Sequence, residues 1–202
     1  MIKNLIFDVG GVLFQYRWKE MFMSYGATED EAFRIGWGMF CSNVWTNKLD
    51  AGLIEFGDVI EAFKEEFSGR DLELLSQFIG HAEEMVVYRP EVWDKISELK
   101  KRGYKTYILS NYSKELLMMH MSGCMQLWDM MDGAIVSSEV KVTKPNRGIY
   151  EKLLETYDLK AEECLFFDDR KDNVDGGIAA GIAGFHVTSR DALNEKLSEL
   201  LI

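Results

Sequence analysis

The chain has 202 residues, of which 47% are hydrophobic and only two are proline, so its length and composition exclude disordered and fibrous proteins. It contains 34 acidic residues against 23 Lys and Arg, and the formal charge of −11 repels nucleic-acid phosphates and acidic membrane surfaces. We therefore expect neither a nucleic-acid partner nor a membrane partner. The three cysteines show no disulfide or zinc spacing, and the first apolar run is too short for a signal peptide, which together predict a cytoplasmic protein.

Short apolar runs that end abruptly in a polar residue predict the strands of a sheet. In chain order the runs are residues 5–7, 106–109, 134–136 and 165–167. Apolar runs without alternation are typical of parallel strands that helices cover on both faces. Residues 90–102 and 148–157 lie between these runs and have apolar side chains at helical spacing. The pattern predicts an α/β fold with a doubly wound, Rossmann-like parallel sheet.

Residues 15–88 interrupt this pattern because they contain no convincing run of this kind. They are rich in Met, Phe, Trp and Glu, and their apolar side chains recur at helical spacing. We interpret the segment as a helical cap, inserted in an α/β core of residues 1–14 and 89–202, that closes over the carboxyl edge of the sheet. Within it, Trp45 precedes a glycine-containing turn and is a candidate substrate contact, although packing between helices is the favoured role for this side chain.

Acidic residues follow two of the predicted strands. Asp8 opens a turn that contains Gly10, and Asp168 and Asp169 follow the last apolar run, with Asp172 close behind. Because the carboxyl ends of parallel strands meet at one edge of the sheet, we expect these carboxylates to lie close together. Oxygen-only ligands favour Mg²⁺, and a carboxylate at such an edge is also a candidate nucleophile. Ordinary turn and helix-capping roles are the alternatives for these acids.

Three further polar residues suit the binding of an anion. Ser110 and Asn111 follow the second predicted strand and offer hydroxyl and backbone donors, and Lys144 offers a positive charge. Each of them alone is more typical of a surface turn. Their order in the chain, together with the acids, is acid, hydroxyl, lysine and acid pair, and all but the lysine directly follow a strand. This combination predicts a site that binds both an anion and a cation.

In this order the motifs resemble those of the haloacid dehalogenase-like superfamily of phosphatases. The matching stretches are residues 7–12, 109–111, 144–145 and 166–169, with Asp172 and Asn173 following. Each motif is weak alone, but the four together are specific. Within the superfamily, the chain resembles the bacterial sugar-phosphate phosphatases of the alpha-glucose-1-phosphatase type, whose small helical cap is inserted where residues 15–88 lie here.

The resemblance implies a Mg²⁺-dependent phosphomonoesterase that acts on a small phosphorylated metabolite, such as a sugar phosphate. Asp8 would attack phosphorus and form an aspartyl phosphate, while Ser110 and Lys144 would hold the phosphoryl oxygens. The metal ligands would be Asp8, Asp168 and the carbonyl of Gly10. Asp169 and Asp172 would act as outer groups that orient the waters of the ion.

Gly10 departs from the pattern of the superfamily, because most of its phosphatases carry there a second Asp that serves as general acid and base. The departure leaves the proton donor unassigned, and we expect a preference for leaving groups that need little protonation. A haloacid dehalogenase also tolerates the absence of this Asp, but it needs no metal, so the acid pair argues against that function. A non-catalytic phosphate-binding protein is the alternative of another class, and the sequence is compatible with a monomer or a homodimer.

Overall fold

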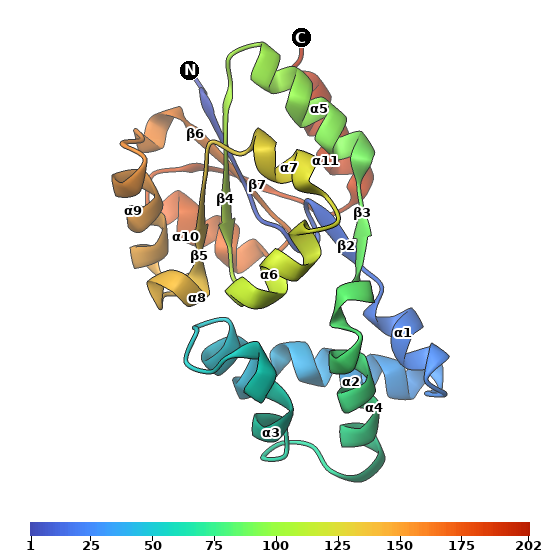
Figure 1. Ribbon diagram of the computed structural model, residues 1–202. Helices are drawn as coiled ribbons and strands as arrows, with labels where there is room; N and C mark the ends of the chain where they lie inside the picture. The colour runs from blue at the N-terminus through green and yellow to red at the C-terminus, as the bar shows by residue number, and fades with distance from the viewer.

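The computed structural model describes all 202 residues and contains a five-stranded parallel sheet with helices on both faces (Figure 1). The strand order is β5-β4-β1-β6-β7. The strands are β1 (Asn4–Phe7), β4 (Lys105–Ser110), β5 (Gly133–Val136), β6 (Cys164–Asp168) and β7 (Ala183–His186). The predicted α/β fold with a doubly wound parallel sheet is confirmed. Because β1 lies between β4 and β6, the residues that follow these three strands are neighbours at the carboxyl edge.

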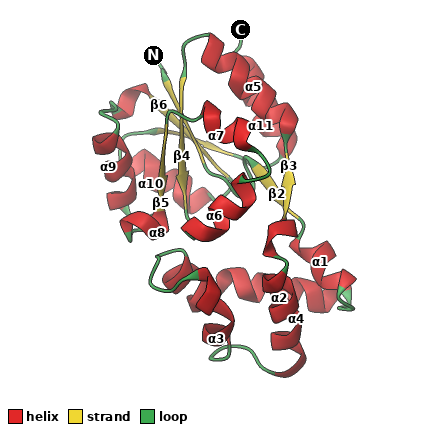
Figure 2. Cartoon of the chain, viewed as in Figure 1, coloured by secondary structure: helices red, strands yellow, loops and turns green.

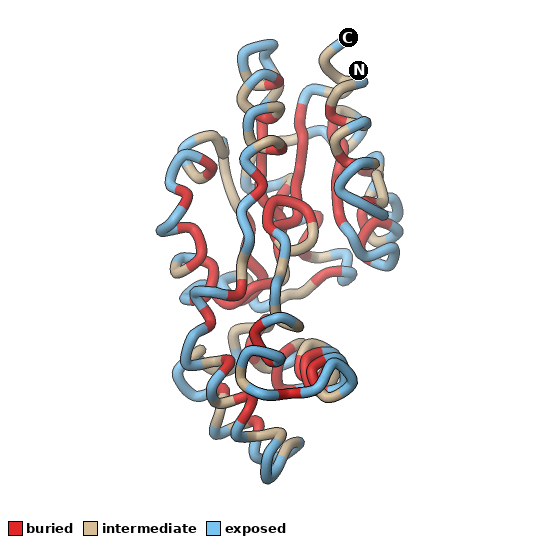
Figure 3. The backbone as a smooth tube through the Cα atoms, turned by 90° about the vertical axis from the view of Figure 1, so that its right-hand side faces the viewer, coloured by how far each residue is buried: buried red, intermediate tan, exposed pale blue.

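The strands alternate their side chains between two hydrophobic clusters, one on each face of the sheet. Leu5 and Phe7 of β1 belong to the larger cluster, and Ile6 belongs to the smaller one. Figure 3 shows the buried residues gathered along the strands and on the inward sides of the helices. The helices of this part are α5 (Pro90–Lys101), α6 (Lys114–Met121), α7 (Met125–Met130), α8 (Ser137–Val140), α9 (Arg147–Thr156), α10 (Lys171–Ala179) and α11 (Arg190–Glu199), with the short turn η4 (Ala161–Glu163).

The chain between β1 and α5 is mainly helical and lies beyond the carboxyl edge of the sheet (Figure 2). Its elements are α1 (Trp18–Ser24), α2 (Glu29–Cys41), η1 (Val44–Leu49), η2 (Phe56–Asp58), α3 (Val59–Phe63), α4 (Gly69–Gly80) and η3 (Ala82–Met85). Helix α2 starts at a capping box, in which Thr28 and Glu31 satisfy each other's backbone N–H groups. None of the helices combines the length and the apolar composition that a membrane span requires.

Three short strands were not expected from the apolar runs. β2 (Phe14–Tyr16) and β3 (Val86–Tyr88) pair antiparallel where the chain enters and leaves the helical segment. β2 is interrupted by the polar Gln15, and β3, although apolar, has only three residues and is partly exposed, so neither resembles the longer buried runs of the sheet. β7 also lacks a clear apolar run, because it contains Gly184 and His186 and lies at the edge of the sheet. Their pairing depends on neighbours that are distant in sequence.

The packing of α9 on the sheet gives a stability prediction. Leu153 is fully buried in the smaller hydrophobic cluster, so Leu153→Ala should lower the free energy of unfolding by about 2–5 kcal/mol, measured by urea denaturation. Glu155→Ala, on the exposed side of the same helix, should change it by less than about 0.5 kcal/mol. Equal losses in the two variants would contradict the assignment of this face of α9 to the core.

Candidate active site

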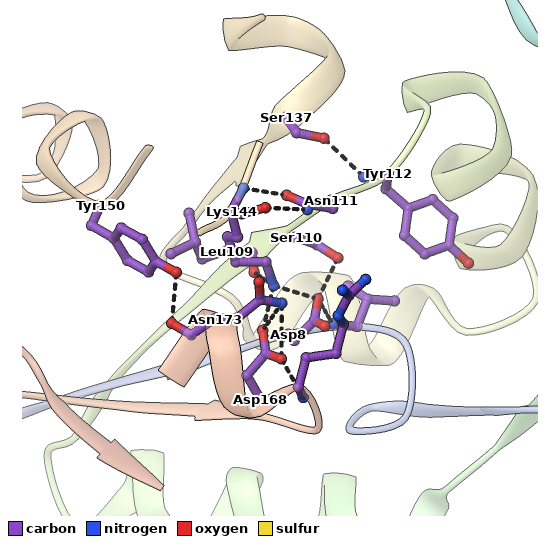
Figure 4. Close-up of polar contacts among 12 residues, drawn as sticks. Asp8, Leu109, Ser110, Asn111, Tyr112, Ser137, Lys144, Tyr150, Asp168 and Asn173 are labelled. Atoms are coloured by element: carbon purple, nitrogen blue, oxygen red, sulfur yellow. Dashed lines mark hydrogen bonds and ion pairs between the residues drawn. The ribbon is translucent and has the colours of Figure 1, made fainter. Parts of the chain in front are cut away.

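Side chains from four parts of the chain meet at the carboxyl edge of the sheet (Figure 4). Asp8 follows β1, Ser110 ends β4, Asp168 ends β6, and Lys144 lies in the loop between α8 and α9. All four residues are buried. The structure therefore brings together the acid, the hydroxyl and the lysine on which the sequence-based hypothesis depends.

The two carboxylate oxygens of Asp8 have different surroundings. Its Oδ1 accepts hydrogen bonds from the Ser110 hydroxyl at 2.5 Å and from the Val9 backbone N–H at 2.7 Å, and lies 3.0 Å from Nζ of Lys144. Its Oδ2 has no hydrogen-bonding partner in the protein. Burial, opposed by the charge of Lys144, raises the pKa of Asp8 from 3.8 to about 7. One oxygen is thus fixed in place while the other is available to react.

Lys144 is the only basic side chain in contact with these acids, and its side chain has no exposed surface. Its Nζ donates to Oδ2 of Asp168 at 2.6 Å and to the carbonyl oxygen of Leu109 at 2.8 Å. Burial opposes the positive charge, but the nearby carboxylates of Asp168 and Asp8 outweigh burial and raise the pKa of Lys144. The lysine is therefore charged and links the two carboxylates.

Two asparagines hold the ends of this ion pair. The side chain of Asn111 accepts from the backbone N–H of Lys144 at 2.7 Å and donates to its carbonyl at 3.0 Å. The amide of Asn111 therefore positions Lys144. This differs from the sequence-based expectation that Asn111 binds the anion directly. Asn173 of α10, whose role the sequence did not identify, donates to both oxygens of Asp168 at 3.0 and 3.1 Å. Its position five residues after Asp168, in the first turn of the helix, is the only sequence signal for it.

The acids at the carboxyl end of β6 are not equivalent. Oxygens of Asp8, Asp168 and Asp169 lie within 4.8 Å of one another and form a group that could hold a metal ion. Both oxygens of Asp168 already accept hydrogen bonds, from Lys144, Asn173 and the backbone N–H of Arg170. The carboxylate of Asp169 accepts no side-chain hydrogen bond and is exposed. Asp172 is exposed in the first turn of α10 and is not a member of the group.

The turn after Asp8 contains two glycines that make room for other side chains. A Cβ on Gly10 would lie 2.7 Å from Cε2 of Tyr16 and even closer to its hydroxyl group. Gly11 has a φ of 70°, and a Cβ there would overlap the carboxylate of Asp169. Tyr16 thus lies against the turn that carries Asp8. No sequence pattern indicated this contact, because Tyr16 lies in β2, which pairs with the distant β3.

Two residues of the helical segment have different relations to the site. Trp45 is buried and its ring packs against Phe40, with the ring centres 5.1 Å apart. Its place is therefore in the packing between helices, not among the polar groups around Asp8. Asp50 lies in the turn that follows Trp45, and its carbonyl accepts from the Ser137 hydroxyl at 2.5 Å. Burial and the charge of Asp8 raise the pKa of the Asp50 carboxyl well above its ordinary value.

A cleft of about 650 Å³ opens beside Gly11 and Asp169. Arg89, His186 and Arg190 contribute to its polar lining. The cleft gives the exposed carboxylate of Asp169 access to solvent and to small molecules.

The sequence matches the haloacid dehalogenase-like hydrolase family over residues 2–181. It is 28% identical to the sesquiterpene phosphatase astK of Aspergillus oryzae over 205 residues, which cover 98% of this chain and 96% of that protein. Both matches span nearly the whole chain, including the strand ends that carry Asp8, Ser110 and Asp168 and the loop that carries Lys144.

Solved structures share the fold at lower identity. The enzyme bt-2542 of Bacteroides thetaiotaomicron, as an Asp-to-Ala mutant in complex with magnesium and inorganic phosphate, superposes with a TM-score of 0.66 at 21% identity, covering 92% of this chain and 94% of that one. The L-2-haloacid dehalogenase of Xanthobacter autotrophicus gives a TM-score of 0.71 at 20% identity, covering 98% and 83%. Identities this low show a common architecture and do not choose between phosphate and halide chemistry.

The raised pKa of Asp8 gives a prediction for the metal-free protein. Between pH 4 and 7 the folded state holds a proton on Asp8 that the unfolded state has released, so this group makes the protein less stable as pH rises. Asp8→Asn removes the titrating group. The unfolding free energy of the variant minus that of the wild type, from urea titrations in EDTA, should therefore increase from pH 5 to pH 8. A difference that is constant with pH would contradict the environment described for Asp8.

Proposed function

We propose that this chain, which belongs to the haloacid dehalogenase-like hydrolase family, is a Mg²⁺-dependent phosphomonoesterase that forms an aspartyl phosphate on Asp8. The observation that carries the proposal is the asymmetry of Asp8. Ser110, Val9 and Lys144 fix Oδ1, so Oδ2 is held in one direction without a partner, as a nucleophile must be. The name of the full-length relative from A. oryzae supports phosphatase activity.

The chemistry of the donor set fits a divalent cation. Three carboxylates share the site with one ammonium group, which leaves an excess of negative charge that a hard, oxygen-liganded ion would neutralise. We assign the ligand positions to Asp8, Asp169 and the carbonyl of Gly10. Asp168, which the sequence suggested as a ligand, has both oxygens engaged and in this proposal orients Lys144. When bound, Mg²⁺ would offset the repulsion between a carboxylate and a phosphate dianion.

The protein groups then have distinct roles. Oδ2 of Asp8 attacks phosphorus, while the Ser110 hydroxyl and the Lys144 ammonium hold Oδ1 and stabilise the negative charge of the phosphoryl oxygens beside it. Asn111 and Asn173 fix the lysine and its partner carboxylate, so these groups do not have to reorganise during the reaction. Water later attacks the aspartyl phosphate and regenerates the carboxylate.

We also propose that residues 15–88 act as a cap over the site and that the substrate is a small phosphorylated metabolite of the cytoplasm, with sugar phosphates as the first class to assay. Two contacts support a cap position. The Asp50 carbonyl accepts from Ser137, and the carbonyl of Gly52 accepts from Lys141, so the turn after η1 lies on α8 beside the site. A segment seated there would exclude bulk water from the reacting groups.

The nucleophile prediction compares Asp8→Asn with Asp175→Asn. The first should release less than about 1% as much phosphate from p-nitrophenyl phosphate as the wild type, because a nucleophile cannot be replaced by a binding group. Asp175 is exposed on α10 and pairs only with Lys171, so its variant should keep wild-type activity. If Asp8→Asn retained more than a few per cent of the activity, the covalent mechanism would have to be abandoned.

The metal prediction uses the same substrate with the wild-type protein. Dialysis against EDTA should abolish phosphate release, and MgCl₂ should restore it, since the excess carboxylate charge would otherwise repel the phosphate dianion. Halide release from a 2-haloacid is assayed in parallel with and without the metal. Metal-independent halide release, with no phosphate release, would assign the protein to the dehalogenases, and no turnover of either substrate would favour a binding protein.

A further inference from the structure

The site described above lacks a group for the proton chemistry of ester hydrolysis. A leaving oxygen needs a proton when it departs from phosphorus, and the attacking water must lose one. The Ser110 hydroxyl donates to Asp8, and the Lys144 ammonium donates to Asp168 and to a main-chain carbonyl. None of these groups is free to exchange a proton with the substrate.

A chain of three side chains runs from the Asp8 turn to a buried histidine. Tyr16, which lies against Gly10, donates its hydroxyl hydrogen to the Tyr112 hydroxyl at 3.1 Å. Tyr112 in turn lies 2.8 Å from Nδ1 of His120, and Nε2 of His120 lies 2.8 Å from the carbonyl oxygen of Ala82. Tyr112 and His120 are almost completely buried, at 4% and 1% exposure. Water therefore does not compete for these hydrogen bonds.

The Ala82 carbonyl fixes the direction of the whole chain. A carbonyl only accepts, so Nε2 must carry a hydrogen, and Nδ1 of the neutral imidazole is then an acceptor. Tyr112 consequently donates to Nδ1, and Tyr16 donates to Tyr112. In this state Tyr16 has given its hydrogen to Tyr112, and a lone pair of its oxygen, which lies against Gly10, can accept a hydrogen from water.

Protonation of His120 reverses the direction of the Tyr16–Tyr112 and Tyr112–His120 hydrogen bonds and leaves the bond from His120 to Ala82 unchanged. With hydrogens on both ring nitrogens, His120 still donates to Ala82 and now also donates to Tyr112. Tyr112 then donates to Tyr16, and the hydroxyl hydrogen of Tyr16 points toward the site. The chain thus has one form that accepts a proton at the site and one form that supplies a proton there.

We propose that Tyr16, Tyr112 and His120 form a proton relay that serves as the general acid and base of the phosphatase reaction, a proposal that rests on the function proposed above. Tyr16 is the catalytic residue that touches the reacting oxygens, and Tyr112 and His120 act through it. No role of this kind was expected for His120, which is isolated in the sequence from any motif.

In the first step the relay starts with protonated His120. Oδ2 of Asp8 bonds to phosphorus, and the bond from phosphorus to the ester oxygen breaks with its electron pair going to that oxygen. The ester oxygen takes the proton of Tyr16, Tyr16 takes the proton of Tyr112, and Tyr112 takes the Nδ1 proton of His120. The products are the free alcohol, the aspartyl phosphate and neutral His120.

The second step runs the relay in the other direction. The oxygen of a water molecule that donates to Tyr16 bonds to phosphorus, and the bond from phosphorus to Asp8 breaks with its electron pair returning to the carboxylate. The water proton passes to Tyr16, while the protons of Tyr16 and Tyr112 move along to Nδ1 of His120. The relay returns to its starting form, and one ester and one water have become one alcohol and one phosphate.

Asp50 is the alternative proton donor, because its carboxyl is buried and is close enough to Asp8 for the charge of Asp8 to raise its pKa. The carboxyl makes no hydrogen bond in the structure, whereas the Tyr16 hydroxyl lies on the Asp8 turn itself and connects to a group that stores a proton between the two steps. These contacts favour the relay.

The first experiment measures kcat/KM for an alkyl phosphate and for p-nitrophenyl phosphate in Tyr16→Phe, Tyr112→Phe and His120→Asn. Tyr88→Phe is the matched control, since its hydroxyl donates to the His120 carbonyl at 3.0 Å and lies outside the relay. The three relay variants should lose about 10²–10⁴-fold on the alkyl ester and less than about tenfold on the aryl ester, whose leaving group needs no proton. Tyr88→Phe should match the wild type on both esters.

The second experiment follows the two steps separately. Slower hydrolysis of the aspartyl phosphate should give the relay variants a burst of p-nitrophenol, one equivalent per enzyme, that the wild type and Tyr88→Phe lack. A merely structural loss would lower both steps and both esters equally. Unfolding midpoints of all variants are measured alongside.

The third experiment is the pH profile of kcat/KM for the alkyl ester. Burial lowers the pKa of His120 below its ordinary 6.5, against the effects of the Ala82 carbonyl and the charge of Glu83. Since the first step needs the protonated form, kcat/KM should fall as pH rises through this pKa, and His120→Asn should remove that limb. The titratable groups that face His120 are Tyr112 from the loop after β4, Glu83 from η3, Tyr88 from β3 and Cys124 from the turn after α6.

Several results would overturn the relay while leaving the proposed function intact. One is an unchanged ratio between the two esters in folded Tyr16→Phe and His120→Asn. Another is a selective loss on the alkyl ester in Asp50→Asn alone, which would make Asp50 the proton donor. If the wild type released no phosphate from either ester, the proposed function would fail, and the relay would fail with it.

Discussion

The ammonium group of Lys144 lies between Asp8 and Asp168 with no exposed surface, and the geometry of the site depends on this one buried cation. Without it, two buried carboxylates would face each other in surroundings that screen their repulsion poorly. With it, the group that also includes Asp169 still has an excess of negative charge. Burial first, and then the charges of Asp168 and Asp169, raise the pKa of Asp8. The excess of negative charge is also why the donor set fits a divalent cation.

The strand order of the sheet places Asp8 and Asp168 close enough for their charges to interact. β1 lies between β4 and β6, so the residues that follow the three strands project from adjacent positions of one edge. Asn111 and Asn173 then hold the lysine and its partner, each with a pair of hydrogen bonds. A buried ion pair is costly unless its remaining donors and acceptors are satisfied, and here the two amides satisfy them.

Hydrogen bonds near the site join the helical segment to the residues around the sheet. The Asp50 carbonyl accepts from Ser137, which also accepts from the backbone N–H of Tyr112. At the other end of the segment, the Ala82 carbonyl accepts from His120. Tyr16 donates to the Tyr112 hydroxyl at 3.1 Å and stacks on Phe40 of α2, with ring centres 6.0 Å apart. Hydrogen bonds and ring packing therefore connect the segment to the turn that carries Asp8.

The sequence by itself determined the α/β class, the parallel strands and the acids and hydroxyl at their ends, because each of these is a local pattern of an apolar run followed by a polar residue. It indicated Lys144 only through the order of the motifs along the chain. It also determined that residues 15–88 are mainly helical. The different roles of Asp168 and Asp169, the use of Asn111 to hold Lys144, and the packing role of Trp45 were decided only by the tertiary structure. The same is true of Tyr16 and His120, which reach each other through Tyr112 over 104 positions of sequence. Such relations depend on which atoms fill the space around a side chain, and residues distant in the chain supply those atoms.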